Sequence, residues 1–314
     1  MSNLERAPEE TVCGTAEPGR PVVEPLAGRE VVLGGPRGMR VTRTLPTKGR
    51  RMVGAWCFLD AYGPEQAVMR VPPHPHTGLQ TVSWLVDGEV LHRDSVGSEQ
   101  LIKPGQLNLM TAGRGIAHSE ESAFGRIHGA QLWVALPGAH RHVPPHFEHH
   151  PALPVLTLDG GAEATVLMGE LGGVASPAVT YSPLVGAELT LEAPVTLPLT
   201  PGFEYALLAL DGAAEVEGTS FGPGPLIYLG AGRHELTLHA RESARLLLLG
   251  GVPFEEEIVM WWNFVGRSHQ EIVEFRENWM AEGRGFGQVA GFDGPPLPAP
   301  ALPGTTLKPR GRER

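Results

Sequence analysis

Short runs of apolar and β-branched residues alternate with turn-forming residues along most of the chain. The runs LQTVSWLV (79–86) and EVLHRDSV (89–96) flank Asp87-Gly88. An Asp-Gly pair between two strand-forming runs is typical of a tight β-hairpin, so we predict that these two strands pair with each other. A Pro-Gly turn at 104–105 precedes the next run, QLNLM. The pattern predicts many short strands joined by tight turns, which is an all-β fold.

One segment near the C-terminal end has the period of a helix instead. Ser268 is followed three positions later by Glu271, which is the spacing of a capping box at a helix N-terminus. Apolar side chains then recur at helical spacing at Ile272, Val273, Phe275 and Trp279. We predict one short helix over about 268–281, with its aromatic stripe in the core.

The second half of the chain repeats the pattern of the first. In the second half, YALLALDGAAEVEGTSFGPGPLIYLGAGRHELTLHA (205–240) echoes the stretch that begins with VSWLVDGEVLHRDSV. Pro223-Gly224 matches the Pro-Gly turn at 104–105, and Ala-Gly-Arg at 231–233 matches Ala-Gly-Arg at 112–114 with the same offset. A repeat of this length indicates one structural unit present twice.

The repeat divides the chain into parts. Residues 1–28 are rich in Pro, Gly, Glu and Ala without periodicity, so we expect a flexible N-terminal segment. The first β domain is expected at 29–150, and the second at 151–291 with the helix inside it. Residues 292–314 are Pro-rich with a basic end, which predicts an extended or disordered tail.

Composition narrows the class of protein. The 314 residues include 41 Gly and 30 Pro, carry 41% hydrophobic residues and have a formal net charge of -10. Anionic polymers and anionic membranes select basic surfaces, so we expect neither nucleic acid nor membrane as a direct partner. Two cysteines make no disulfide framework, and no signal peptide or apolar run of about 20 residues is present. A cytoplasmic location is expected.

Two pairs of polar residues stand out as candidate metal ligands. His74 and His76 are spaced i, i+2 just before a predicted strand, and His118 and Glu120 repeat that spacing. Residues two apart on a strand share a face, so two adjacent strands would bring all four side chains to one point. Three imidazoles and one carboxylate suit a divalent first-row metal and leave coordination positions open. The alternative interpretation is a set of surface histidines and polar turn residues.

The repeat assigns this chemistry to the first domain alone. Placed on the second copy by the offsets of the matched turns, the four candidate ligands fall on Pro198, Thr200, Thr237 and His239. Such residues cannot form an equivalent metal site. The His-rich stretch 140–150 between the copies contains several prolines and no fixed geometry, and we interpret it as a linker. Whether His92 is a further ligand is left open.

Several motifs resemble the pirin family of the cupin superfamily. They are RRMVGAWCFLDAYGP, HPHTGLQTV, LHRDSVGSEQLIKPG, MTAGRGIAHSE and GAQLWVALPG in the first half, and MWWNFVGRSHQEI in the second. The resemblance implies two tandem cupin β-barrels (double-stranded β-helices), of which the N-terminal one binds a metal. Fe(II) is the first candidate, with Ni, Cu, Mn, Co or Zn as alternatives. The implied ligands are His74, His76, His118 and Glu120.

The resemblance also implies two kinds of function. Some pirins act as quercetin 2,3-dioxygenases, which implies a small aromatic or enolic substrate, dioxygen, and a catalytic Glu120 that ligates the metal and helps accept the substrate proton. Others act as metal- or redox-dependent regulators that dock on a partner protein. The chain departs from the family at Thr77-Gly78-Leu79-Gln80, where many pirins have Arg-Gly-Phe-Glu. Gln80 cannot be an anionic ligand, so Glu120 is the one carboxylate expected at the metal.

Overall fold

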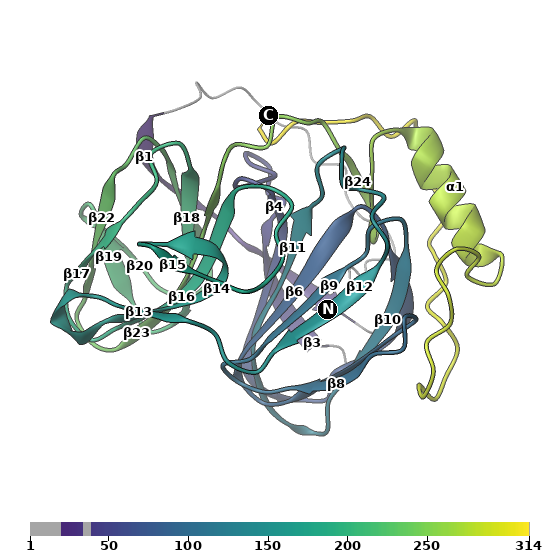
Figure 1. Cartoon of the computed structure of the whole chain (residues 1–314), viewed down its shortest axis with the longest axis horizontal. Coiled ribbons are helices and arrows are strands. Elements are labelled where there is room, and N and C mark those ends of the chain that lie inside the picture. Colours follow the sequence, from purple (N-terminus) through teal and green to yellow (C-terminus); the bar gives the residue numbers. More distant parts are fainter. Residues whose placement is uncertain (1–19, 34–38, 314) are drawn as a thin grey trace.

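The computed structural model describes residues 20–33 and 39–313, which form two β-barrels lying side by side and one flanking helix (Figure 1). This confirms the predicted all-β fold with two tandem cupin domains and a short C-terminal helix. Within the described ranges, no helix has both the length and the apolar composition that a bilayer crossing requires. Residues 1–19 of the predicted N-terminal segment lie outside these ranges.

The first barrel consists of a seven-stranded sheet in the order β12-β9-β6-β11-β4-β3-β2 and a four-stranded sheet in the order β5-β10-β7-β8. Its strands are β2 (Arg29–Leu33), β3 (Met39–Leu45), β4 (Trp56–Ala67), β5 (Arg70–His76), β6 (Leu79–Asp87), β7 (Val90–Asp94), β8 (Glu99–Ile102), β9 (Leu107–Thr111), β10 (Ile116–Glu121), β11 (Gly125–Ala135) and β12 (His146–His150).

The second barrel has the same two-sheet plan, with the orders β1-β21-β18-β23-β16-β14-β13 and β17-β22-β19-β20. Its elements are β1 (Pro21–Leu26), β13 (Val155–Thr157), the 3-10 helix η1 (Asp159–Gly161), β14 (Glu163–Leu171), β15 (Val174–Ala175), β16 (Leu184–Leu191), β17 (Val195–Pro198), β18 (Glu204–Asp211), β19 (Ala214–Val216), β20 (Thr219–Phe221), β21 (Leu226–Ala231), β22 (Glu235–Ala240) and β23 (Ala244–Gly251). The matching strand orders show that the sequence repeat is a structural repeat.

Two segments, expected to be flexible or to be a linker, contain edge strands. Residues 20–28, expected to be flexible, contain β1, which pairs antiparallel with β21 at the edge of the second barrel. There β1 holds the place that β12 holds in the first barrel. The edge of a sheet presents unpaired backbone groups, and β1 satisfies them although its partner lies about two hundred residues further on. Strand β12, in the stretch predicted to be a linker, covers the equivalent edge by pairing with β9.

The C-terminal segment returns to the first barrel. It contains β24 (Val259–Trp261), β25 (Phe264–Gly266) and the helix α1 (His269–Met280), which lies against the first barrel and away from the second (Figure 1). Trp261, Phe264, Ile272 and Trp279 form a buried cluster with Ala117 of β10. Ser268 caps the helix as predicted, accepting a hydrogen bond from the Glu271 amide at 3.2 Å. The helix therefore belongs spatially to the first domain, because its aromatic stripe is buried there.

The Pro-rich tail is extended and bound to the rest of the protein. The amide of Leu297 donates to the Pro73 carbonyl of β5 at 2.8 Å, and Arg310 pairs with Ile258. Arg312 donates to the buried Glu204 carboxylate at 2.9 Å. Of the two alternatives for this tail, extended or disordered, the described residues take the first, and they connect both barrels.

The predicted hairpin at Asp87-Gly88 is wrong as a strand pairing. The chain does turn there, with Gly88 at φ 89°, but β6 pairs with β9 and β11 while β7 pairs with β8 and β10. The turn therefore carries the chain from one sheet of the barrel to the other. An Asp-Gly turn has the same local chemistry whether it joins two paired strands or leads from one sheet to the other, so the sequence pattern alone does not distinguish the two arrangements.

The two barrels share a buried interface. Trp84 of β6 donates from Nε1 to the Glu188 carboxylate of β16 at 2.7 Å, and Trp56 donates to the Val185 carbonyl at 3.1 Å. Apolar side chains of both barrels, including Leu208 and Leu249 of the second, belong to one continuous core. Alternation places Trp84 on the interface side of its sheet, so its neighbour Ser83 faces the inside of the first barrel.

Candidate metal centre

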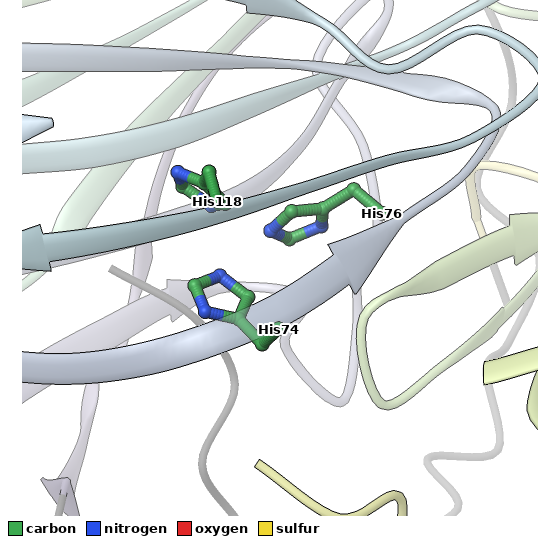
Figure 2. A group of neighbouring side chains, drawn as sticks. All are labelled: His74, His76 and His118. Atoms are coloured by element: carbon green, nitrogen blue, oxygen red, sulfur yellow. The ribbon is translucent and has the colours of Figure 1, made fainter. Parts of the chain in front are cut away.

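Three of the four predicted ligands meet inside the first barrel. Strands β5 and β10 pair antiparallel with His74 directly opposite His118, and His76 follows two residues after His74 on the same face. Figure 2 shows the three rings turned toward one another from these two strands. One ring nitrogen from each lies within 4.8 Å of those of the other two, and each residue is at most 1% exposed.

The hydrogen bonds of two of the rings fix which ring nitrogen carries the proton. His74 Nδ1 lies 2.8 Å from the Pro72 carbonyl and His76 Nδ1 lies 3.1 Å from the Asn263 carbonyl. A carbonyl oxygen only accepts, so in each neutral ring the proton is on Nδ1 and the lone pair is on Nε2. Asn263 belongs to the turn between β24 and β25, so the C-terminal segment helps to orient a predicted ligand.

The donor set fits a metal ion. Nε2 of His76 and Nε2 of His118 are buried and have no hydrogen-bond partner among the described residues. Unsatisfied buried polar atoms are rare and costly, and a metal ion at the shared point would use both lone pairs. Outward hydrogen bonds from Nδ1 that fix a ligating imidazole are a general feature of metal sites. The three histidines could therefore hold a metal ion.

Burial keeps the three imidazoles neutral. Desolvation lowers the pKa of His74 to about 4, although the Pro72 carbonyl and the Glu120 carboxylate partly oppose it. Desolvation also holds the pKa values of His76 and His118 well below the ordinary value, and the neighbouring histidines lower them further. A neutral imidazole is the form that binds a metal, so protons do not compete for these nitrogens at neutral pH.

Glu120, the fourth predicted ligand, lies beside the three histidines but outside the group within 4.8 Å. It is 2% exposed and stands opposite His92 in the β10–β7 ladder. Its Oε1 is 3.4 Å from the hydroxyl of Ser83, which also donates to Gln131 at 3.0 Å. The carboxylate is therefore on the inner face of the barrel, and its role as a ligand stays a prediction.

His92, whose role the sequence leaves open, is next to the group without being part of it. Its Nδ1 is 3.4 Å from Nδ1 of His118, and its Nε2 is 3.1 Å from the Asp94 carboxylate. Sequence reasoning missed Asp94 and Asn263. The spacing of His92 and Asp94, i and i+2 on one strand, is a signal that could have identified Asp94. Asn263 lies in a distant turn and carries no comparable signal.

The residues that depart from the family pattern have structural roles. Gln80 is fully buried, and its Nε2 donates to Thr111 at 2.9 Å and to the Val179 carbonyl at 3.1 Å. It thus connects the first barrel to a loop of the second. Thr77 is buried under the C-terminal segment, where it pairs with Phe264.

The histidines of β12 form no further group of this kind among the described residues. His149 Nδ1 lies 2.8 Å from Asn108 Oδ1. On the other face of the strand, Nε2 of His146 and Nε2 of His150 lie 3.6 and 3.2 Å from the Glu148 carboxylate. The strand is regular and paired along its length, so its alternation separates these side chains.

The second barrel fills the equivalent place with apolar side chains. The inward positions of β17 and β22 are occupied by Val195, Leu197, Leu236 and Leu238. Thr237 and His239, two of the residues named from the repeat, are exposed. The offset of the turns therefore gave the wrong face of this strand pair, because a shift by one residue reverses which side chains point inward. The group of described residues that could hold a metal, His74, His76 and His118, lies in the first barrel.

Comparison with known proteins gives the family. Residues 38–134 match the family model described as Pirin, and residues 184–285 match the one described as Pirin C-terminal cupin domain. A Pseudomonas aeruginosa protein named "Putative quercetin 2,3-dioxygenase" is 48% identical over 290 residues, which are 90% of this chain and 91% of that protein. A pirin-like protein of Caulobacter vibrioides is 38% identical over 255 residues, 77% of this chain and 88% of the relative.

A solved structure supports the same conclusion. The crystal structure of a quercetin 2,3-dioxygenase from Acinetobacter baumannii superposes with a TM-score of 0.86 at 41% sequence identity, covering 91% of this chain and 97% of that one. The first family model lies on the first barrel and includes the three buried histidines, and the second covers the second barrel from β16 onward together with β24, β25 and α1. The chain belongs to the pirin family.

Proposed function

We propose that this protein is a mononuclear metal dioxygenase of the pirin type, with Fe(II) as its metal. Its substrate would be a flavonol such as quercetin or a similar enolic or phenolic compound. The observation that carries the proposal is the group of three buried imidazoles, in which one ring nitrogen of each lies within 4.8 Å of those of the other two. The names of the Pseudomonas and Acinetobacter relatives support the reaction class.

The residues assigned to the metal are His74, His76, His118 and Glu120. A bound divalent metal would act as a Lewis acid that lowers the pKa of a substrate hydroxyl. Three neutral nitrogen donors and one carboxylate leave a net positive charge on a divalent centre, which favours an anionic substrate oxygen. Coordination positions beyond these four would be open to small molecules.

Glu120 is the group that we assign to hold the proton of the substrate hydroxyl. The one hydroxyl hydrogen of Ser83 can go to the Glu120 carboxylate at 3.4 Å or to Gln131 at 3.0 Å, and when Gln131 accepts it a lone pair of Ser83 is available to Glu120. A protonated Glu120 can therefore donate to Ser83, which would stabilise the carboxylic acid after proton transfer. The barrel interior keeps bulk water away from this exchange, since both residues are buried.

Aromatic side chains pack around the group and hold its rings in place. Trp133 packs edge-on against His76 with 5.1 Å between ring centroids and is itself stacked on Phe58 at 4.0 Å. Phe147 stacks on His92 at 4.4 Å.

The test is oxygen uptake by tag-free protein reconstituted anaerobically with Fe(II). With quercetin present, we expect consumption of equimolar dioxygen and flavonol. An oxygen electrode measures the dioxygen, and the loss of absorbance measures the flavonol. The variant His118→Ala should consume neither, and Glu120→Gln should retain metal binding in part while losing most of its turnover. Full iron occupancy without oxygen uptake on any flavonol or catechol would contradict the enzymatic proposal and favour a regulatory role.

A further inference from the structure

A buried carboxylate is fixed at the end of β7, two residues from His92. Asp94 is 3% exposed, and its Oδ1 accepts hydrogen bonds from the amides of Val96 at 3.0 Å and Ser98 at 2.9 Å. Its other oxygen, Oδ2, lies 3.1 Å from His92 Nε2. An aspartate carboxyl is ionised at neutral pH, and the two amide donors at Oδ1 stabilise that ionised form. Asp94 is therefore a carboxylate that can only accept.

The ring of His92 joins this carboxylate to a metal ligand. Its Nδ1 is 3.4 Å from Nδ1 of His118, and Phe147 lies parallel to the ring with 16° between the planes. His92 is 3% exposed, and each of its ring nitrogens has a protein neighbour, Asp94 at Nε2 and His118 at Nδ1. The stacking fixes the plane of the ring and the two hydrogen bonds fix its rotation within that plane.

The direction of the hydrogen bond between His92 and His118 follows from the hydrogen bond between His92 and Asp94. Because Asp94 accepts, the proton of neutral His92 is on Nε2, and its Nδ1 has a lone pair. Between the facing nitrogens one must donate, so His118 carries its proton on Nδ1. The lone pair of His118 is then on Nε2, which is buried and has no hydrogen-bond partner among the described residues.

We propose that Asp94 and His92 are positioning residues, which together set the tautomer and the orientation of the metal ligand His118. This role rests on the proposed metal centre. The other two ligating rings are held by backbone carbonyls, of Pro72 and Asn263, which substitution cannot remove. His118 is the ring of the three whose partner is a side chain, so the contribution of the outer hydrogen bond can be tested there. Partners of this kind raise metal affinity by about 10- to 100-fold.

The variant Asp94→Asn reverses the hydrogen bonds while keeping the shape of the side chain. The turn amides of Val96 and Ser98 require an acceptor, so the amide oxygen takes the place of Oδ1 and the NH₂ group faces His92. His92 then accepts at Nε2 and donates from Nδ1, which moves the proton of His118 to Nε2. We expect the Kd for Zn²⁺, measured by chelator competition, to rise about 10- to 100-fold.

The matched control is His128→Gln. His128 is another buried histidine of the first barrel and lines a surface pocket with Arg40 and Pro223, so its replacement should leave the Kd for Zn²⁺ unchanged. Nitrogen-15 NMR of the metal-free wild type gives a second readout that needs no variant. We expect Nε2–H on His92 and Nδ1–H on His118, and both assignments should exchange in Asp94→Asn.

The possible failures are distinguishable. Absence of Zn²⁺ binding by the wild type would overturn the metal centre and this role of Asp94 and His92 with it. Wild-type Zn²⁺ binding with an unchanged Kd in Asp94→Asn would overturn the positioning role alone. The opposite tautomers in the wild type, with Nδ1–H on His92 or Nε2–H on His118, would also overturn it.

Discussion

Alanine at Gly78 should disturb both the stability of the protein and its metal affinity. Gly78 follows the His-x-His pair, has a φ of 68°, and would place a Cβ atom 2.2 Å from the Val265 carbonyl oxygen of β25. An ordinary carbon-to-oxygen contact is about 3.3–3.6 Å, so the two backbones must separate by about 1 Å. The hydrogen bonds at risk are Val265 N–H to the Thr77 carbonyl, 3.1 Å, and His76 Nδ1 to the Asn263 carbonyl, 3.1 Å.

The loss of stability caused by the clash can be separated from the loss caused by backbone strain alone. A left-handed conformation costs a residue with a Cβ about 1–2 kcal/mol, and each lost hydrogen bond costs about 0.5–1.5 kcal/mol. We therefore expect Gly78→Ala to lower the free energy of unfolding by about 2–5 kcal/mol. Gly105→Ala is the matched control, because Gly105 has a φ of 78° with nothing within 4 Å of the added Cβ. It should cost only the strain, about 1–2 kcal/mol.

The assay is urea unfolding of the metal-free proteins at neutral pH, together with Zn²⁺ affinity by chelator competition. Gly78→Ala should weaken Zn²⁺ binding by about 10-fold or more, because His76 loses the carbonyl that orients it. Gly105→Ala should bind Zn²⁺ like the wild type. Equal losses of stability in the two alanine variants, with wild-type Zn²⁺ affinity in both, would refute the claim that the C-terminal segment supports the metal site.

Three further predictions concern other parts of the structure. Burial raises the pKa of the Cys57 thiol to about 12, so in a variant whose other cysteine is serine it should react with thiol reagents only after unfolding; rapid labelling of the native protein would contradict this. Trp84→Phe removes the donor to the Glu188 carboxylate and should cost about 1.5–3 kcal/mol in urea unfolding, whereas no loss would mean that the hydrogen bond contributes nothing. Hydrogen bonds from Arg141 lower the pKa of Glu271 below its ordinary 4.5, so the carboxylate adds stability that is full above pH 4.5 and lost as the pH falls through the lowered pKa. The melting temperatures of the wild type and Glu271→Gln should thus differ more at neutral pH than in acid, and an equal difference at both would be inconsistent with this ion pair.

Local sequence patterns correctly predicted the structural features that depend on residues close together in the chain. The helix at His269–Met280 follows from its cap and its apolar period, and the His-x-His and His-x-Glu pairs follow from strand alternation. The group of histidines could be predicted because His74 and His76 end one strand and His118 lies within its neighbour, so alternation fixes the face on which each side chain lies. The repeat gave the architecture because its turns recur at matching places in both barrels.

Features that depend on distant partners could not be predicted in the same way. Strand β1 is defined by β21, and the carbonyl of Asn263 reaches His76 only because the C-terminal segment folds back on the first barrel. The turn at Asp87-Gly88 is local, but the sheet that each flanking strand joins is decided by all the other strands. The wrong face of β22 arose because one residue of offset reverses an alternating pattern.

Metal stoichiometry tests the central claim most directly. Tag-free protein should be loaded with Fe(II) or Zn²⁺, freed of weakly bound ions by dialysis, and measured by elemental analysis alongside His118→Ala and His146→Ala. We predict one ion per chain in the wild type and in His146→Ala, whose imidazole is on the outer face of β12, and none in His118→Ala. Full occupancy in His118→Ala, or loss of the ion in His146→Ala, would contradict a single metal held by the buried histidines of the first barrel.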